Sequence, residues 1–431
     1  MKSLEQMIAE LCPDGVEYKK LGELGYFYGG LTGKNKHDFT NGNAPFVTYM
    51  NIYSNPGLDL NIVDFVKVGE DEKQNSIEKG DILFTGSSET PDEAGMTSVV
   101  MEQPSSSVYV NSFCFGFRFH DLSNISAGFM KHLFRSRKIR KSISKTANGV
   151  TRFNISKKML LDLEIPVPPL AVQERIVEIL DKMTALTAEL QAELQARQQQ
   201  YEYYRNHLLS FGGLDNIHSE VADSQSITLP HHWELLKMSE IFEIRNGYTP
   251  SKNNADFWDG GTIPWFRMED IRANGRILSD SFQHITPKAV KGKGLFEKDS
   301  FIIATTATIG EHAWLIADSL ANQRFTNLKV RKSLTASLMP KFVYYYLFIV
   351  DEWCKRNVNA SSFASVDMDK FKDLEFPIPP LAEQQRIVDI LDRFEALTSD
   401  LQSGLPAEIA ARQQQYEYYR NKLLTFKRKT A

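Results

Sequence analysis

Apolar side chains recur every seven residues along a long stretch in the middle of the chain. The two rows consist of Ile176, Met183, Leu190 and Tyr204, and of Leu180, Leu194, Tyr201 and Leu208. Thr187 and Arg197 interrupt these rows. A stripe sustained over about five heptads predicts a coiled-coil helix. A helix from Ala171 to Ser210 would be about 60 Å long, at about 1.5 Å per residue.

A second stripe of the same kind follows further along the chain. It is formed by Ile387, Phe394, Leu401, Tyr416, Tyr419 and Leu423. Four additional residues lie within its QSGLPAEIAA segment. They amount to about one helical turn, so the apolar face is preserved. Because Gly404 and Pro406 interrupt the pattern and proline is tolerated in a first turn, we expect two helices with a break near 403–406.

The two stripes belong to an internal repeat. LEIPVPPLAVQERIVEILDKMTALTAEL from Leu163 corresponds to LEFPIPPLAEQQRIVDILDRFEALTSDL from Leu374, an offset of 211 residues. ARQQQYEYYRNHLLSF from Ala196 reappears as ARQQQYEYYRNKLLTF from Ala411, an offset of 215 residues. Such self-similarity indicates a pseudo-twofold tandem repeat. The predicted segments are a first globular domain at 1–160, a helix at 161–212, a second globular domain at 213–371 and a helical region at 372–431.

The order of these segments favours pairing of the two stripes within one chain. The first helix ends where the second globular domain begins, and the second helical region starts where that domain ends. Pairing would therefore give an antiparallel coiled coil between two globular domains. A homodimeric coiled coil between chains is the alternative, and a tethered partner of equal length favours the intramolecular form.

Each variable segment mixes short β-type runs with turn signals and then a helical stretch. The β-type runs are DILFTG and TSVVM in the first segment, and SFIIATTATIG and NLKVRK in the second. The helical stretches are GFMKHLFRSRKIRKSI and PKFVYYYLFIVDEWCKR. These patterns predict α+β domains, each with a small sheet and closing helices.

The composition is that of a soluble globular protein, with 42% hydrophobic and 24% charged residues. The longest apolar run, from Phe342 to Val350, is too short to cross a bilayer. Polar residues near the first methionine argue against a signal peptide. Three widely separated cysteines, Cys12, Cys114 and Cys354, suit free thiols in a reducing compartment. We therefore expect a cytoplasmic protein.

Charge is distributed unevenly along the chain. The formal net charge is −4, whereas nucleic-acid binders usually carry a basic excess. However, the stretch from Lys131 to Lys158 holds ten Lys or Arg residues and no Asp or Glu. Such a run is the local electrostatic footprint of phosphate contact, although a solvated surface helix is the alternative. In the second domain, basic residues alternate with Asn and Thr, and arginine and asparagine can read base edges.

Motifs for catalysis or metal binding are missing. GGLTGKN from Gly29 lacks the glycine spacing of a phosphate-binding loop, and Asn35 follows Lys34 where Ser or Thr is needed. We interpret this segment as a turn or a DNA-contacting loop. No GxGxxG follows a strand, and the His231–His232 pair has no third ligand nearby. The sequence predicts no catalytic residues and no metal ligands.

The repeat resembles the specificity subunits of type I restriction–modification systems. The resemblance covers the whole chain and is carried by the PxPPLAxQxRI blocks at Pro166–Ile176 and Pro377–Ile387 and by the QQQYEYYRN…LL tails. It implies that each variable domain is a target-recognition domain reading one half of a bipartite, asymmetric site in double-stranded DNA. It further implies that the constant helices act as the spacer.

The resemblance also implies a division of labour among subunits. Two methyltransferase subunits and the restriction/translocase subunits would join this chain, which would be non-catalytic by itself. The assembly would act as a type I restriction endonuclease and an adenine-specific DNA methyltransferase. S-adenosylmethionine, ATP and Mg²⁺ would belong to those partners, so no cofactor is expected here. The alternative is a coiled-coil adaptor with two protein-binding domains, which leaves the acid-free basic run unexplained.

The candidate residues fall into two groups. Candidates for DNA binding, drawn from the resemblance, the basic run and the polar loops, are Lys34, Thr85, Ser87, Arg137, Lys138, Arg140, Lys141, Arg152, Asn154, Arg267, Arg272, Thr305, Thr306, Gln323, Arg324 and Ser362. Candidates for the subunit or helix interface are Gln173, Arg175, Ile176, Met183, Leu190, Tyr204, Gln384, Arg386, Ile387, Phe394, Leu401 and Tyr419.

Overall fold

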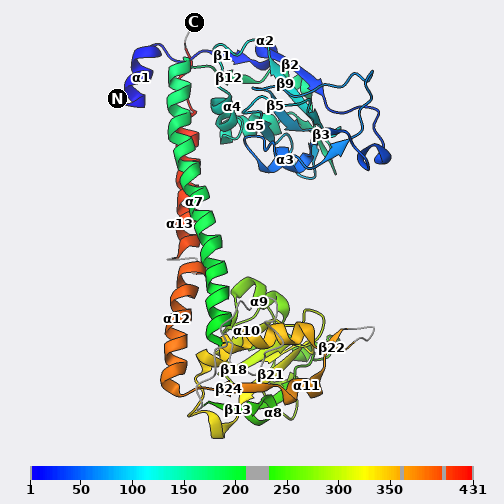
Figure 1. Cartoon of the computed structure of the whole chain (residues 1–431), viewed down its shortest axis with the longest axis vertical. Coiled ribbons are helices and arrows are strands. Elements are labelled where there is room, and N and C mark those ends of the chain that lie inside the picture. The colour runs from blue at the N-terminus through cyan, green and yellow to red at the C-terminus, as the bar shows by residue number, and fades with distance from the viewer. Residues whose placement is uncertain (1, 210–232, 360–363, 400–403, 430–431) are drawn as a thin grey trace. The chain divides into compact units, whose positions relative to one another are not determined.

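The computed structural model describes residues 2–209, 233–359, 364–399 and 404–429 (Figure 1). The chain forms two compact units. Unit 1 consists of Met1–Ala192 and Ala407–Ala431, and unit 2 consists of Glu193–Pro406. The 40-residue helix α7 (Leu170–Leu209) contributes its first part to unit 1 and its second part to unit 2. Each unit is thus a globular region together with helical segments from both constant blocks.

Unit 1 is built on an antiparallel four-stranded sheet in the order β2-β9-β5-β7. Its phenylalanine-rich core packs against the helices that follow β9. Smaller sheets have the orders β4-β3-β8 and β10-β11-β6, and β1 pairs with β12. The elements are α1 (Leu4–Leu11), β1 (Tyr18–Lys20), α2 (Leu21–Leu24), β2 (Gly25–Gly29), β3 (Ala44–Val47), α3 (Tyr49–Ser54), β4 (Phe65–Val66), β5 (Ile82–Thr85), β6 (Ser87–Ser88), β7 (Thr97–Val99), β8 (Tyr109–Val110), β9 (Cys114–Phe119), α4 (Ala127–Leu133), α5 (Arg137–Ser144), β10 (Ala147–Asn148), β11 (Phe153–Ile155), α6 (Lys157–Leu161) and β12 (Glu164–Pro166).

Unit 2 contains a mixed five-stranded sheet in the order β14-β21-β18-β19-β16. The largely buried α10 packs against it, and a three-stranded sheet has the order β17-β15-β20. The elements are β13 (Glu234–Lys237), α8 (Met238–Ile241), β14 (Phe242–Asn246), β15 (Ile263–Phe266), α9 (Met268–Asn274), β16 (Ile277–Leu278), β17 (His284–Ile285), β18 (Ser300–Ala304), β19 (His312–Leu315), β20 (Leu320–Ala321), β21 (Phe325–Val330), α10 (Pro340–Arg356), β22 (Val358–Asn359), β23 (Ser365–Val366), α11 (Met368–Asp373) and β24 (Glu375–Ile378).

The helical stretch of the first region is two helices, α4 and α5, where the sequence predicted one. Arg135 lies between them, and its guanidinium donates hydrogen bonds to the carbonyls of Thr97, Ile52 and Tyr53. The following residue, Ser136, is the N-cap of α5. Because these contacts fix the chain at Arg135, the helix ends and restarts there. The corresponding α10 is continuous over Pro340–Arg356, as the sequence predicted.

The apolar stripes pair within the chain. In unit 1 the first part of α7 runs antiparallel to α13 (Leu405–Leu423), and in unit 2 the second part runs antiparallel to α12 (Leu381–Ser399) (Figure 1). In unit 2 the rings of Tyr201 and Tyr204 lie 6.4 and 5.5 Å from the ring of Phe394. The homodimeric alternative is therefore not needed to bury the stripes.

The inserted segment of the second block separates two helices. α12 ends at Ser399 and α13 begins at Leu405, so Pro406 is the second residue of α13. Residues 400–403, including Leu401 and part of the expected break, lie outside the described residues.

The chain segment after α13 completes unit 1. Val16 N–H donates to Lys427 O over 2.8 Å, and Lys429 N–H donates to Val16 O over 2.9 Å. Gly15 has φ +105°, and a Cβ there would lie 2.8 Å from the backbone of Arg428. Glycine is therefore required where the two segments pass each other.

Each long helix begins with a fully buried glutamine. The Gln173 amide accepts from Ser126 N–H over 2.9 Å and donates to the carbonyls of Asn124 and Pro168. The Gln384 amide repeats this set with Met339 N–H, Ser337 O and Pro379 O. We call these two sets of hydrogen bonds the glutamine clasps.

The glutamine clasps place two of the predicted interface residues. Gln173 and Gln384 were expected at a subunit or helix interface, but both are 0% exposed. Each binds the first turn of its helix to the globular region of its own unit. A buried amide with all three hydrogen bonds made specifies one position of the helix on that region.

The two units differ at the next contact along the helices. In unit 1, His132 lies 2.7 Å from Asp181 Oδ1 through Nε2 and 2.9 Å from Tyr416 Oη through Nδ1. Burial lowers the pKa of His132 below its ordinary 6.5. In unit 2, Tyr345 Oη donates instead to Asp392 and Glu395. A titratable imidazole in one copy is thus replaced by a phenol in the other.

None of the helices in the described ranges is both long and apolar enough to span a membrane.

The Q384A variant should destabilise unit 2 by about 2–4 kcal/mol, because truncation leaves one buried N–H and two buried carbonyls without partners. All five tryptophans lie between Trp233 and Trp353, in unit 2, so their fluorescence reports its unfolding in denaturant. The matched control is Q385A at the exposed next position, which should change stability by less than about 0.5 kcal/mol. Equal midpoints for the two variants would refute the role of the glutamine clasp.

Unit 1 should lose stability as the pH falls below about 6.5. Because the folded-state pKa of His132 is depressed, its contribution is complete above the unfolded value of 6.5 and is lost as the pH falls through the folded pKa. The charged neighbours Lys131 and Arg420 oppose protonation, whereas Asp181 favours it. Hydrogen exchange of α4 amides between pH 7.5 and 5 measures the effect. H132Q should flatten this pH dependence, and an unchanged slope would contradict the assignment.

Candidate nucleic-acid interface

The basic run of unit 1 divides into buried and exposed members. Lys131 Nζ lies 2.7 Å from Asp181 Oδ1. Arg140 donates to the carbonyls of Gly95, Ala94 and Asp92. Burial lowers the pKa of both Arg135 and Arg140 to about 10. These three side chains hold the unit together, and the DNA contact of Arg140 stays a prediction.

The other seven members are exposed, and four of them lie on α5 or at its C-cap. They are Arg137, Lys138, Lys141, Lys145, Arg152, Lys157 and Lys158. Lys138 Nζ lies 5.2 Å from the centre of the Tyr18 ring, beside an open cleft of about 460 Å³ that Lys145 also lines. Solvent-facing ammonium groups without a buried partner are suited to phosphate contact.

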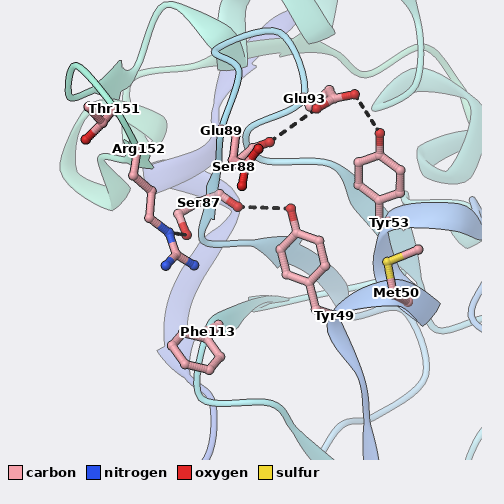
Figure 2. A pocket seen from close by; sticks show the side chains of 10 residues that line it. All are labelled: Tyr49, Met50, Tyr53, Ser87, Ser88, Glu89, Glu93, Phe113, Thr151 and Arg152. Atoms are coloured by element: carbon pink, nitrogen blue, oxygen red, sulfur yellow. Dashed lines mark hydrogen bonds between the residues drawn. The ribbon is translucent and has the colours of Figure 1, made fainter. Parts of the chain in front are cut away.

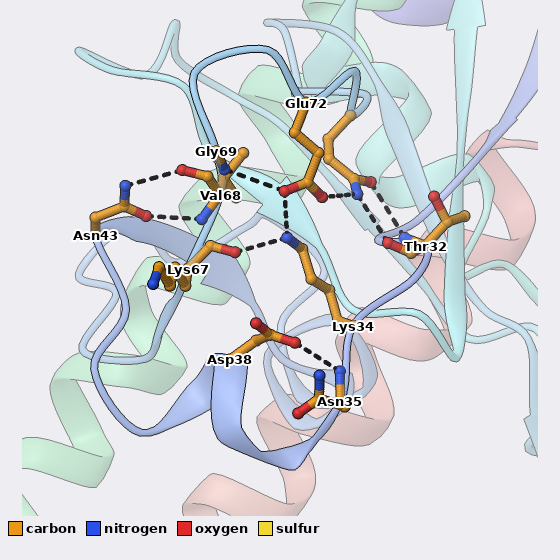
Figure 3. A network of polar contacts seen from close by, with 10 residues as sticks. Thr32, Lys34, Asn35, Asp38, Asn43, Lys67, Val68, Gly69 and Glu72 are labelled. Carbon is orange, nitrogen blue, oxygen red and sulfur yellow. Dashed lines mark hydrogen bonds and ion pairs between the residues drawn. The ribbon is translucent and has the colours of Figure 1, made fainter.

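Lys34 is engaged within its own region (Figure 3). Its side chain is only 7% exposed, and Nζ lies 2.5 Å from Glu72 Oε2 and 2.6 Å from Lys67 O. Hydrogen bonds from Lys34, Gln74 and Gly69 N–H lower the pKa of the Glu72 carboxyl to about 2. The ammonium is thus neutralised internally, and the DNA contact of Lys34 stays a prediction.

Two threonines at the ends of central strands are also structural. Thr85 is 0% exposed, and its Oγ1 accepts from Met96 N–H over 2.9 Å. Thr305 is 6% exposed, and its Oγ1 lies 3.0 Å from Thr326 Oγ1. Both hydroxyls are satisfied inside the protein, and their contact with DNA stays a prediction.

A β-hairpin beside the main sheet of unit 1 presents the polar loop. Strands β10 and β11 pair Ala147 with Ile155 and Asn148 with Asn154. Gly149 has φ +141°, and a Cβ there would lie 2.0 Å from Arg152 O, so only glycine fits this turn. At the tip Val150 is 90% exposed, and Thr151, Arg152 and Asn154 are exposed as well.

This hairpin borders an open cleft of about 520 Å³ (Figure 2). The structure brings two predicted residues together there, because Arg152 Nε donates to Ser87 Oγ over 2.9 Å. The cleft is lined by Tyr49, Met50, Tyr53, Ser87, Ser88, Glu89, Glu93, Phe113, Thr151 and Arg152. Its walls offer aromatic faces, carboxylates and one guanidinium, which suit an uncharged, hydrogen-bonding ligand such as a base edge.

Sequence reasoning did not identify the aromatic wall of this cleft. Tyr49 Oη donates to Ser87 O over 3.0 Å, and Tyr53 Oη donates to Glu93 Oε1 over 2.9 Å. Their spacing of four residues, which places both on one side of α3, was the available signal. Phe113 is 61% exposed, an unusual position for phenylalanine, and nothing in the local sequence marks it.

The candidates of unit 2 occupy several separate positions. Gln323 and Arg324 are exposed beside each other, and Gln323 Oε1 accepts from Thr249 over 2.5 Å. Thr306 is half-buried and forms a bridge with Ser365. Arg267 is the N-cap of α9, and Arg272 is exposed on the same helix. Ser362 lies outside the described residues.

The helix candidates have partners within their own units. Ile176 and Ile387 are completely buried. Arg175 pairs with Glu178, and Arg386 Nη2 lies 2.6 Å from Glu383 Oε1. Leu190, Tyr204 and Phe394 lie on the paired stripes, and Met183 and Tyr419 line a shallow apolar groove of about 300 Å³ in unit 1.

Within the described ranges, no group of three or more His, Cys, Asp or Glu side chains is arranged to hold a metal ion.

Comparison with known proteins gives a consistent result. The family model "Type I restriction modification DNA specificity domain" matches residues 13–197 and 230–411. The chain is 52% identical over 201 residues to the type I restriction enzyme EcoprrI specificity subunit of Escherichia coli, which covers 45% of this chain and 50% of that protein. It is 38% identical over 277 residues to the EcoR124I/EcoR124II specificity subunit of the same species, covering 61% and 63%. The matches thus span between half and two thirds of these relatives.

A solved structure has the same fold. A chain from a study of "complex assembly and conformational transition of the type I R-M system" superposes with a TM-score of 0.64 at 18% identity, covering 95% of this chain and 97% of that one. The predicted fold class, two α+β regions with packed long helices, is confirmed.

Two neighbouring residues of α5 should respond differently to truncation. R140A should cost about 2–4 kcal/mol of stability in unit 1, because three backbone carbonyls lose their donor. K141A should leave stability unchanged, weaken binding to random-sequence duplex, and reduce the slope of log K against log salt by about one. Hydrogen exchange and salt-dependent binding of the purified chain measure both. A destabilised K141A, or a stable R140A with weakened DNA binding, would reverse the assignment.

Proposed function

Because the chain belongs to the type I restriction modification DNA specificity family, we propose that it is the subunit that selects the DNA site for a type I restriction–modification complex. In this proposal each unit reads one half of a bipartite, asymmetric site in duplex DNA. The helical segments of the two constant blocks connect the reading regions and act as the spacer.

The observation that carries the proposal is that the two units share one scaffold but have different exposed residues. The glutamine clasp recurs at an offset of 211 residues (384 − 173), with the same three kinds of partner. Around it, the exposed residues differ between the units: the basic face of α5 in unit 1 has no counterpart of equal density among the described residues of unit 2. A shared scaffold with divergent surfaces suits the same task performed on two different targets.

Catalysis in this proposal belongs to partner subunits. Methyltransferase subunits would supply S-adenosylmethionine chemistry on adenine, and restriction subunits would supply ATP-driven cleavage. This division fits the slightly acidic chain, because partners can contribute much of the phosphate contact. The residues of this chain would orient the complex on its site through phosphate contacts and select the sequence through base contacts.

Exchanging residues 13–157 for the equivalent region of another family member tests this function. Co-expressed with its methyltransferase subunit, the chimera should change one half of the methylated sequence and keep the other half and the spacer. Genome-wide mapping of methylated bases measures this directly. A change in both halves, or in neither, would contradict separate reading. If the unaltered chain and its methyltransferase produce no methylated motif, the adaptor alternative gains support.

A further inference from the structure

The hairpin that borders the unit 1 cleft has a counterpart in unit 2 with the same register. β10–β11 pairs Ala147 with Ile155, and β22–β23 pairs Val358 with Val366, an offset of 211 residues for both partners. The second pair, Asn148 with Asn154, recurs as Asn359 with Ser365. The hairpins are therefore of equal length, with no insertion in either tip.

Both hairpins also dock on their sheets in the same way. Ile155 N–H donates to Gly86 O over 2.9 Å, and Val366 N–H donates to Thr305 O over 2.9 Å. Beyond this bond, Asn154 lies opposite Ser87, and Ser365 lies opposite Thr306. Backbone hydrogen bonds thus place the hairpin identically in both units, independently of the side chains at its tip.

The tips themselves have different sequences. Residues 149–153 read GVTRF, whereas residues 360–364 read ASSFA. A segment of constant length and constant docking whose sequence differs is suited to determining specificity. In unit 1 the charged residue of this tip is Arg152.

The Arg152 guanidinium is bound on its Nε side, which faces the protein. Nε donates to Ser87 Oγ, and the group lies 5.8 Å from the centre of the exposed Phe113 ring. Among the described contacts, none engages Nη1 or Nη2 of Arg152. Figure 2 shows both terminal nitrogens pointing away from Ser87, toward the side where Phe113 lies. The planar outer edge, with its two parallel donors, is therefore oriented and free.

We propose that Arg152 reads a guanine in the half-site of unit 1, donating from both Nη atoms to O6 and N7, and that Ser87 is the residue that positions it. The inference rests on the proposed function and adds the base and the residue that reads it. Two parallel donors in one plane match the two acceptors on the major-groove edge of guanine. With Nε bound to Ser87, this edge is presented before DNA arrives, which lowers the entropy cost of the contact.

The surroundings of Arg152 favour a base over a phosphate. Glu89 and Glu93 line the same cleft, and both are exposed. The pKa of Glu93 is lowered by hydrogen bonds from Thr90 and Tyr53, so its carboxylate is ionised at neutral pH. Two carboxylates repel a phosphate, whereas a neutral base edge carries no such cost. Lys138 and Lys141, away from this cleft on α5, are better placed for the DNA backbone.

The test uses the full chain co-expressed with its methyltransferase subunit and maps methylated bases across the genome. The half-site of unit 1 is the half that changes when residues 13–157 are exchanged. In R152A, one guanine of that half-site should lose preference by at least about fivefold, the low end of a bidentate arginine contact. The other half-site should be unchanged. R152Q should also lose guanine and shift toward adenine, because glutamine pairs with the adenine edge.

Two further variants separate positioning from general effects. S87A should weaken the preference for the same guanine by less than R152A does. In the double variant, adding R152A to S87A should not restore that preference. K79A removes a positive charge at the opposite end of β5, where Lys79 is exposed, and should leave the motif intact. Hydrogen exchange confirms that each variant keeps the fold of unit 1.

The outcomes are distinguishable. Unchanged guanine preference in R152A and R152Q overturns the inference, whether methylation is normal or uniformly weaker at all sites, the latter being the signature of a phosphate contact. In either case a bipartite methylated motif with the unaltered chain still supports the proposed function. Absence of any motif with the unaltered chain overturns both.

Discussion

In each unit one buried amide side chain binds the globular region to the first turn of the long helix, and the other contacts between the two lie further along that helix. An amide with three hydrogen bonds and no exposure has little freedom to shift, since any displacement leaves buried polar groups unpaired. The prolines before each glutamine add to this constraint, because they fix the extended entry and supply a carbonyl that the amide binds. The position of the helix on the globular region is therefore specified by polar contacts, and the buried apolar residues of the helix stabilise it.

This arrangement explains how the two units can diverge while remaining the same kind of module. Backbone hydrogen bonds hold the hairpins on their sheets, and backbone carbonyls accept hydrogen bonds from the glutamine amides. Neither contact therefore depends on the identity of neighbouring side chains. Exposed positions are free to vary at little cost in stability, since surface substitutions usually change it by less than about 0.5 kcal/mol. Even the helix contact differs, with His132 in one unit and Tyr345 in the other.

Periodicity predicted the helices well, whereas charge alone could not show which basic side chains face solvent, for a physical reason. A heptad stripe and α10 are properties of local sequence, which fixes their period and length. By contrast, Arg140 and Lys141 are adjacent in a run of identical character, yet one is bound to three carbonyls and the other faces solvent. Which of them turns inward depends on Gly95 and its neighbours, distant in sequence. The same holds for Lys34 and Glu72, and for Arg152 with Ser87: tertiary pairing decides whether a polar group is used internally or presented outward.

The order in which the segments of unit 1 are synthesised differs from that of unit 2. Unit 2 is one continuous stretch. Unit 1, by contrast, needs residues beyond Pro406 for the segment whose backbone hydrogen-bonds to Val16 and for the helix that covers the first part of α7. On a ribosome adding about 5–20 residues per second, all of unit 2 is translated first, a delay of about 10–40 s. Throughout that interval the apolar face around Met183 is uncovered in the nascent chain. The region of the chain that is translated first is thus the last to be completed.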